Sequence, residues 1–223
     1  MTGASIHLNK FVDNLIDLGD EKAYPSIIAN CTINQNTASS STNLTSYQSL
    51  IKNRSPLLVT DTVLDGNINT AYLIGRGVNM TIQRTTITNN LVVKGGLVSG
   101  QLSNVVVSNS TMSHNTLVNS VAIDMDGSQV ALHNVVIDQN IHANGSNHLI
   151  QCTVGSITMN NVVNNGASLI NCDERTCSIN GDNSDVCKSG RLSGGAIAGI
   201  VIGSIVGCAI IVTLVVVLVI KKK

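Results

Sequence analysis

The stretch MTIQRTTITNN at residues 80–90 returns as VVVSNSTMSHN at residues 105–115 and as VALHNVVIDQN at residues 130–140. In each copy, two apolar residues stand two positions apart, a third apolar residue follows five positions after the second of them, and an asparagine ends the copy. Alternation with a period of two residues is typical of β-strands, and asparagine is typical of the turns between them. A strand-forming unit that returns every 25 residues decides the fold.

The same unit extends in both directions. Ile157 and Met159 continue it downstream, and two upstream sets fit it with a longer step of 30 residues, Ile28/Ile33/Asn36 and Leu58/Val63/Gly66. A second apolar pair accompanies the units, at Leu73/Ile74, Leu97/Val98, Ala122/Ile123, Leu149/Ile150 and Leu169/Ile170. Short strands, Asn, Gly and Ser turns and only two prolines predict an all-β ectodomain over residues 1–180. We expect a right-handed parallel β-helix of about 25 residues per coil, in which turn asparagines stack their amides on those of the next coil.

The alternative repeat architecture is a leucine-rich repeat, whose unit of about 20–29 residues has a similar length. Its Leu-x-x-Leu-x-Leu-x-x-Asn pattern is not sustained here, and no helical stretch alternates with the strands. The β-helix is therefore the favoured interpretation.

Residues 194–220 contain no charged side chain, and three lysines, residues 221–223, follow them. About 20 apolar residues suffice for a helix to cross a bilayer, and lysines mark the cytoplasmic side. We expect a juxtamembrane linker at residues 181–193, a transmembrane helix at 194–220 and a cytoplasmic tail at 221–223. The protein is thus expected to be an integral, single-pass type I protein of the plasma membrane, with an extracellular N-terminal domain.

Glycines recur every four residues in the predicted span, at Gly195, Gly199, Gly203 and Gly207. This spacing places them on one helix face, where small residues let a second helix approach, so the span is a candidate for homo-oligomer formation. The alternative is that glycine is simply common in membrane helices.

Five cysteines lie before the span, and an oxidising compartment favours disulfides among them. The disulfide candidates are Cys152, Cys172, Cys177 and Cys187. Because LIQC at 149–152 and LINC at 169–172 are near copies, we expect Cys152–Cys172 and Cys177–Cys187, with Cys31 left over. Parallel Cα–Cβ vectors would strain a bond between stacked residues, however. The alternative is that Cys172 pairs with Cys177 or Cys187 and that Cys152 packs, unpaired, as a small apolar residue.

Six Asn-x-Ser/Thr sequons occur, and the glycosylation candidates are Asn30, Asn43, Asn79, Asn109 and Asn144. The sixth, Asn53, is a doubtful acceptor because Pro56 follows its serine.

Parallel β-helices also host pectate lyases and polygalacturonases, whose sites cluster aspartates on neighbouring coils. Asp124 and Asp126 have no second acidic pair about one coil away, and we interpret them as turn residues. The five histidines, His7, His114, His133, His142 and His148, are interpreted as solvated turn residues. We predict no catalytic, cofactor-binding or metal-binding residue, no cofactor and no enzyme activity, and the net charge of zero argues against a nucleic-acid partner.

The first 25 residues lack the apolar region of a signal peptide, and residues 1–8 match residues 125–132 in their Met, Gly and apolar positions. We therefore expect the chain to be N-terminally truncated, with further coils and a signal peptide upstream.

The stacked Asn- and Ser-rich coils, the cysteine cluster, the Gly/Val/Ile-rich span and the lysine tail together resemble the polymorphic-membrane-protein-like surface proteins of trichomonad-type parasitic protists. The resemblance implies display, adhesion or coat formation at the cell surface, with an extracellular protein or glycan as ligand, and supplies no site residues. The alternative is a membrane-tethered polysaccharide lyase or hydrolase whose catalytic coils lie upstream.

Overall fold

The computed structural model describes residues 1–11, 14–18, 25–39, 48–77, 79–143, 148–164, 168–172 and 177–182. These residues belong to a compact unit that runs Met1–Cys187. The predicted linker beyond residue 182, the span and the tail lie outside the described residues. Within those residues, no helix has the length and apolar character needed to cross a membrane.

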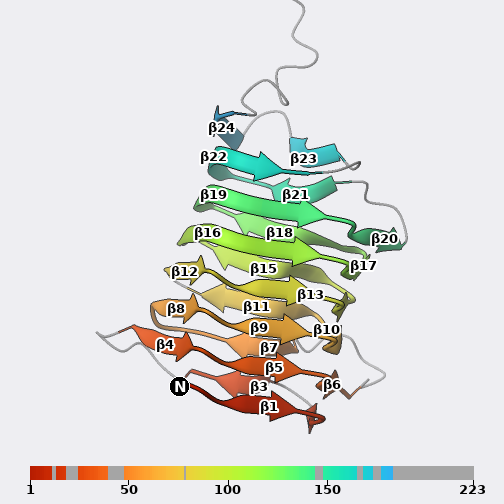
Figure 1. The fold of residues 1–223 in the computed structure, drawn as a ribbon. Coiled ribbons are helices and arrows are strands. Elements are labelled where there is room, and N and C mark those ends of the chain that lie inside the picture. Colours follow the sequence, from red (N-terminus) through yellow and green to blue (C-terminus); the bar gives the residue numbers. More distant parts are fainter. Residues whose placement is uncertain are drawn as a thin grey trace, which may run out of the picture. The chain divides into compact units, whose positions relative to one another are not determined.

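The described chain is an all-β solenoid of about six turns, and all of its paired strands are parallel (Figure 1). Sheet A has 11 strands: β1 (Ser5–His7), β4 (Ser26–Ala29), β5 (Thr32–Asn34), β8 (Leu57–Thr60), β9 (Val63–Asp65), β12 (Met80–Gln83), β13 (Thr86–Thr88), β16 (Asn104–Ser113), β19 (Ser128–Asp138), β22 (Gly155–Val163) and β24 (Cys177–Gly181).

Two further sheets complete each coil. Sheet B contains β2 (Lys10–Phe11), β6 (Thr37–Ala38), β10 (Ile68–Thr70), β14 (Leu91–Val92), β17 (Thr116–Val118) and β20 (Ile141–Ala143). Sheet C contains β3 (Asn14–Asp17), β7 (Ser49–Lys52), β11 (Tyr72–Gly77), β15 (Gly95–Gln101), β18 (Ser120–Asp126), β21 (His148–Cys152) and β23 (Ser168–Cys172). The predicted parallel stack of coils is confirmed, and the leucine-rich repeat is not the fold.

Sheet A bends in every coil at one residue with a left-handed backbone. We call these residues the bend row: Asn30, Asp61, Arg84, Asn109, Asn134 and Asn161, with φ of 48° to 54°. In the early coils the bend separates two short strands, such as β12 and β13, whereas β16, β19 and β22 continue through it. Asparagine adopts this conformation more readily than most residues, which explains its frequency at the bend.

The core is built from columns of equivalent side chains in neighbouring coils. One column runs through sheet C in register: Ile16, Ile51, Ile74, Val98, Ile123, Ile150 and Ile170. All seven are buried. Branched aliphatic side chains suit this arrangement because they have few rotamers to lose and pack well on a pleated strand.

An asparagine ladder lies inside the turn between sheets A and B. It consists of Asn9, Asn36, Asn67, Asn90, Asn115 and Asn140, and each of the first five donates a hydrogen bond of 2.9–3.0 Å from Nδ2 to Oδ1 of the next. Each Oδ1 from Asn36 onward also accepts the backbone N–H of the preceding member. Asn36, Asn67, Asn90 and Asn115 are at most 1 % exposed. The expected stacking of turn amides is therefore confirmed, and it satisfies polar groups that burial would otherwise destabilise.

Candidate functional site

A polysaccharide-active site would need acidic side chains on the neighbouring coils, in register with Asp124 and Asp126. Asp124 in β18 is in register with Ser99 of the preceding coil and Gln151 of the following one. Asp126 is in register with Gln101. The coils adjacent to Asp124 thus present neutral side chains at the equivalent position, and the described residues contain no group of three or more His, Cys, Asp or Glu side chains able to hold a metal ion.

The interpretation of all five histidines as solvated turn residues is wrong for four of them, because His7, His133, His142 and His148 lie in strands. His133 lies in β19 and its Nδ1 is 3.0 Å from Nδ2 of Asn160 in the next coil. His142 lies in β20 in register with the core residue Leu117, and His148 lies in β21. Burial, and then the nearby charge of His148, lower the pKa of His142. The sequence spacing did not show that His148 would affect His142.

An ion pair that the sequence did not reveal joins two members of the bend row. Arg84 donates from Nε to Oδ1 of Asp61 at 2.6 Å and from an Nη atom to Oδ2 at 2.8 Å. The same guanidinium reaches Oγ1 of Thr60 at 2.9 Å. The hydrogen bond from Arg84, followed by that from Thr60, lowers the pKa of Asp61 to about 2. The sequence signal that could have revealed the pair is the separation of Asp61 and Arg84, which is close to one coil and places them at the bends of neighbouring coils.

Replacing Arg84 by glutamine is expected to return the pKa of Asp61 toward its ordinary value of 3.8. In the wild type, the Asp61 carboxylate favours the folded state above pH 3.8, and this contribution is lost as the pH falls through about 2. The Asp61 carboxyl carbon, followed by NMR against pH, measures the shift directly. A Lys52→Gln control on sheet C should leave the titration of Asp61 unchanged, and an unchanged Asp61 in Arg84→Gln would contradict the assigned cause.

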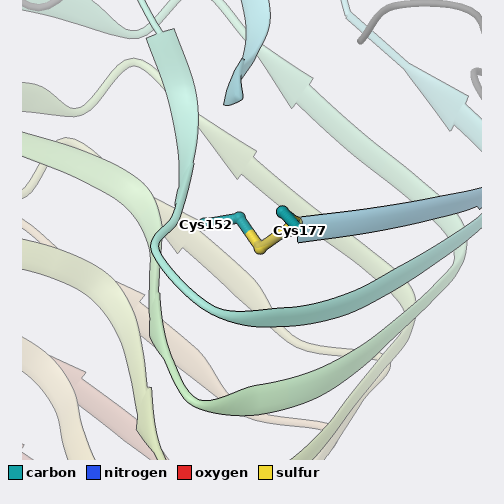
Figure 2. Close-up of a disulfide and its surroundings, with 2 residues drawn as sticks. All are labelled: Cys152 and Cys177. Atoms are coloured by element: carbon teal, nitrogen blue, oxygen red, sulfur yellow. A yellow bond between two sulfur atoms is a disulfide. The ribbon is translucent and has the colours of Figure 1, made fainter. Parts of the chain in front are cut away.

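The structure corrects the predicted disulfides, since Cys152 pairs with Cys177 (Figure 2). Neither Cys152–Cys172 nor Cys177–Cys187 forms, and Cys152 does not pack as an unpaired residue. Cys172 is indeed the register neighbour of Cys152, but side chains of stacked residues run parallel rather than toward each other. Cys177 begins β24 above Gly155, on the far side of the turn from sheet C to sheet A, with a Cα–Cα distance of 6.0 Å. Cys31 is unpaired and buried, as expected, and Cys187 lies outside the described residues.

The disulfide closes a loop of 25 residues around the last described turn. Replacing Cys177 by serine is expected to lower the free energy of unfolding by about 3 kcal/mol, because the unfolded chain regains the entropy of an open loop. Urea unfolding of the oxidised protein measures this loss. Cys172→Ser is the control, and it should leave a Cys152–Cys177 peptide in a non-reducing digest. A Cys152–Cys172 peptide in the wild type would contradict this pairing.

The sequons occupy different environments. Asn30 and Asn109 lie in the bend row, Asn79 precedes β12, and all three are exposed. Asn53 is 0 % exposed and its Nδ2 donates to the carbonyl oxygen of Ser55 at 3.1 Å. Asn43 and Asn144 lie outside the described residues.

The outward face of the first half of sheet A, before the bend, is a regular surface of the described chain. Its central column contains Ile27, Leu58, Thr81, Val106 and Ala131, which are equivalent residues of successive coils. Ile27 is 45 % exposed and the other four are half-buried. We call these five residues the outer column. They form a straight, uncharged stripe, which is a surface for contact rather than for acid–base chemistry.

Comparison with known proteins gives no relative: no family model, no curated protein and no solved structure matches this chain. The function therefore has to be argued from the chain itself.

Proposed function

We propose that this chain is a cell-surface protein in which a right-handed parallel β-helix is displayed outside the plasma membrane for adhesion or coat formation, without catalysis. The charge-free segment at residues 194–220 and the terminal lysines support the membrane anchor and its orientation. The resemblance to the surface proteins of trichomonad-type protists agrees with this role. A protein or a glycan outside the cell would be the partner.

The observation that carries this proposal is the asparagine ladder, which joins six coils by hydrogen bonds between amides, the four central ones of which are buried. A chain of satisfied amides makes the stack of coils resist local opening, because each broken bond leaves a buried polar group unpaired. Rigidity of this kind lowers the entropy that a displayed surface loses on binding. Neutral neighbours around Asp124 favour this role over the polysaccharide-active alternative.

Protease protection of intact cells tests the location. Protease added outside should remove the β-helix and leave a small membrane-bound stub, since only the tail at residues 221–223 is expected in the cytosol. An antibody raised against residues 60–150 should stain cells without permeabilisation. Staining that appears only after permeabilisation would refute the surface location.

A further inference from the structure

The sequons of the described chain separate into two groups by the hydrogen bonds of their amides. Oδ1 of Asn79 accepts the backbone N–H of Asn104 at 3.2 Å, and Oδ1 of Asn109 accepts Nδ2 of Asn134 at 3.0 Å. Among the described residues, Nδ2 of Asn79 and of Asn109 has no hydrogen-bond partner. A sugar is attached to Nδ2, so both side chains can carry a glycan and keep the hydrogen bonds that hold them.

Asn30 belongs to the same group. It is exposed in the bend row, and within the described chain its side chain makes no hydrogen bond. Asn53 belongs to the other group, because its Nδ2 is buried and already donates to Ser55. A glycan on Asn53 would force a hydrated oligosaccharide into the packed interior, which is incompatible with the fold.

The three exposed asparagines border the outer column. Asn79 stands where the chain enters the first half of sheet A, and Asn30 and Asn109 stand at the bend where the chain leaves it. Four residues lie between the two borders within a coil, so the borders are five residue steps apart, which corresponds to about 17 Å along a strand. An oligosaccharide is bulky and hydrophilic, so glycans on both borders reach across a strip of this width.

We propose that N-linked oligosaccharides on Asn30, Asn79 and Asn109 flank the outer column and shield its apolar side chains, while Asn53 remains unmodified. This inference rests on the proposed extracellular location, since N-glycans are added outside the cytosol. A shield at this place answers a physical need, because the exposed Ile27 and the half-buried Leu58 and Val106 leave apolar surface that favours non-specific association. Binding partners would then meet other faces of the solenoid.

The first experiment maps the glycans on the full chain, expressed in eukaryotic cells behind an added signal peptide because its first 25 residues lack the apolar region of one. Enzymatic release in H₂¹⁸O marks each occupied asparagine, and peptide mass spectrometry reads the marks. We expect marks on Asn30, Asn79 and Asn109 and none on Asn53. Thr32→Val, Thr81→Val and Thr111→Val should each remove one site, and they are mild changes because Val63, Val106 and Val136 stand at the equivalent positions of the next coil.

Val106→Thr is the matched positive control. It completes a new sequon that begins at Asn104, one coil above the sequon of Asn79 and in the same register. If this new sequon is occupied while Asn79 and Asn109 are not, the inference is wrong and the proposed location stands. Occupancy of Asn53 would have the same meaning. If neither the new sequon nor any natural sequon is occupied, this inference is wrong, while the location is decided separately by the protease-protection experiment.

A second experiment measures the shielding. A cysteine introduced by Leu58→Cys in the outer column should react with a bulky maleimide several-fold more slowly in the glycosylated chain than in the same chain after enzymatic release of its N-glycans, a comparison that leaves the neighbouring Thr81 unchanged. A cysteine introduced by Leu91→Cys on sheet B should react equally before and after the release. Equal rates at position 58 would show that the glycans do not cover the column and would overturn the shielding.

Discussion

Asn115→Ala is expected to lower the free energy of unfolding by about 4 kcal/mol, because it removes a link from the middle of the asparagine ladder. Oδ1 of Asn115 accepts the backbone N–H and Nδ2 of Asn90, each at 3.0 Å. Its Nδ2 donates to the carbonyl oxygens of Ile87 and Ser113 and to Oδ1 of Asn140. Truncation leaves several of these buried groups without a partner, at about 1–3 kcal/mol each before relaxation. Urea unfolding of the purified chain measures the loss.

Asn134→Gly is the matched control for the exposed hydrogen bonds of the bend row. Asn134 also links neighbouring coils, through Asn109 and Asn161, but it is exposed and its backbone is left-handed. Glycine keeps that conformation, and water replaces the lost amide, so we expect a change of about 0.5 kcal/mol or less. Equal losses in the two variants would show that burial does not set the strength of the ladder.

Gly155→Ala adds one methyl group, and we expect it to destabilise the last described coils more than a methyl group added elsewhere in them. Gly155 has a φ of 135°, and a Cβ built on it lies 1.9 Å from the carbonyl oxygen of Ser128 in the coil below. Backbone must move to relieve this contact, so we expect a loss of roughly 3 kcal/mol or more. Because Cys177 is in register with Gly155, the fraction of oxidised Cys152–Cys177 should also fall. Thermal unfolding and a non-reducing digest check the two effects.

Gly66→Asn separates this clash from a simple preference for glycine. Gly66 has a φ of 62°, and a Cβ there meets only ordinary contacts, the nearest atom being Cγ of Gln35 at 3.6 Å. Gln35 and Asn89 occupy the equivalent turn in the neighbouring coils with similar φ values. Asparagine should therefore cost little at this position, and a loss as large as that of Gly155→Ala would contradict the steric explanation.

The repeat carried most of what the sequence could predict. Neighbouring strands of a parallel stack pair at equivalent positions of the repeat. The spacing of the repeat alone therefore predicts that Met80 pairs with Val105 and that Val105 pairs with Val130. The amide ladder followed in the same way, because asparagine ends each unit. Contacts that depend on the direction of a side chain were harder to predict from spacing. Cys172 lies beside Cys152 in register, yet the bond goes across a turn to Cys177.

In the candidate site, too, some features could be predicted from spacing and others depend on local geometry. The sequons and the neutral neighbours of Asp124 were visible in the sequence, whereas the free Nδ2 of Asn79 and the buried Nδ2 of Asn53 depend on turn geometry. The effect of His148 on His142 and the pairing of Arg84 with Asp61 are not resolved by a strand-periodicity argument. The predicted register of the upstream units is also wrong by one residue, because the equivalents of Ile28, Ile33 and Asn36 in the next coil are Val59, Leu64 and Asn67 and not Leu58, Val63 and Gly66.

The unequal lengths of the coils have a consequence for engineering. The distance from the bend row to the asparagine ladder is constant, for example from Asn30 to Asn36 and from Asn109 to Asn115. The connection from sheet B to sheet C varies instead: residues 39–48 join β6 to β7, whereas Ala71 alone joins β10 to β11. A foreign epitope spliced into the short connections from sheet B to sheet C should therefore be tolerated without a register shift, while even one residue added between bend and ladder would misalign every coil above it.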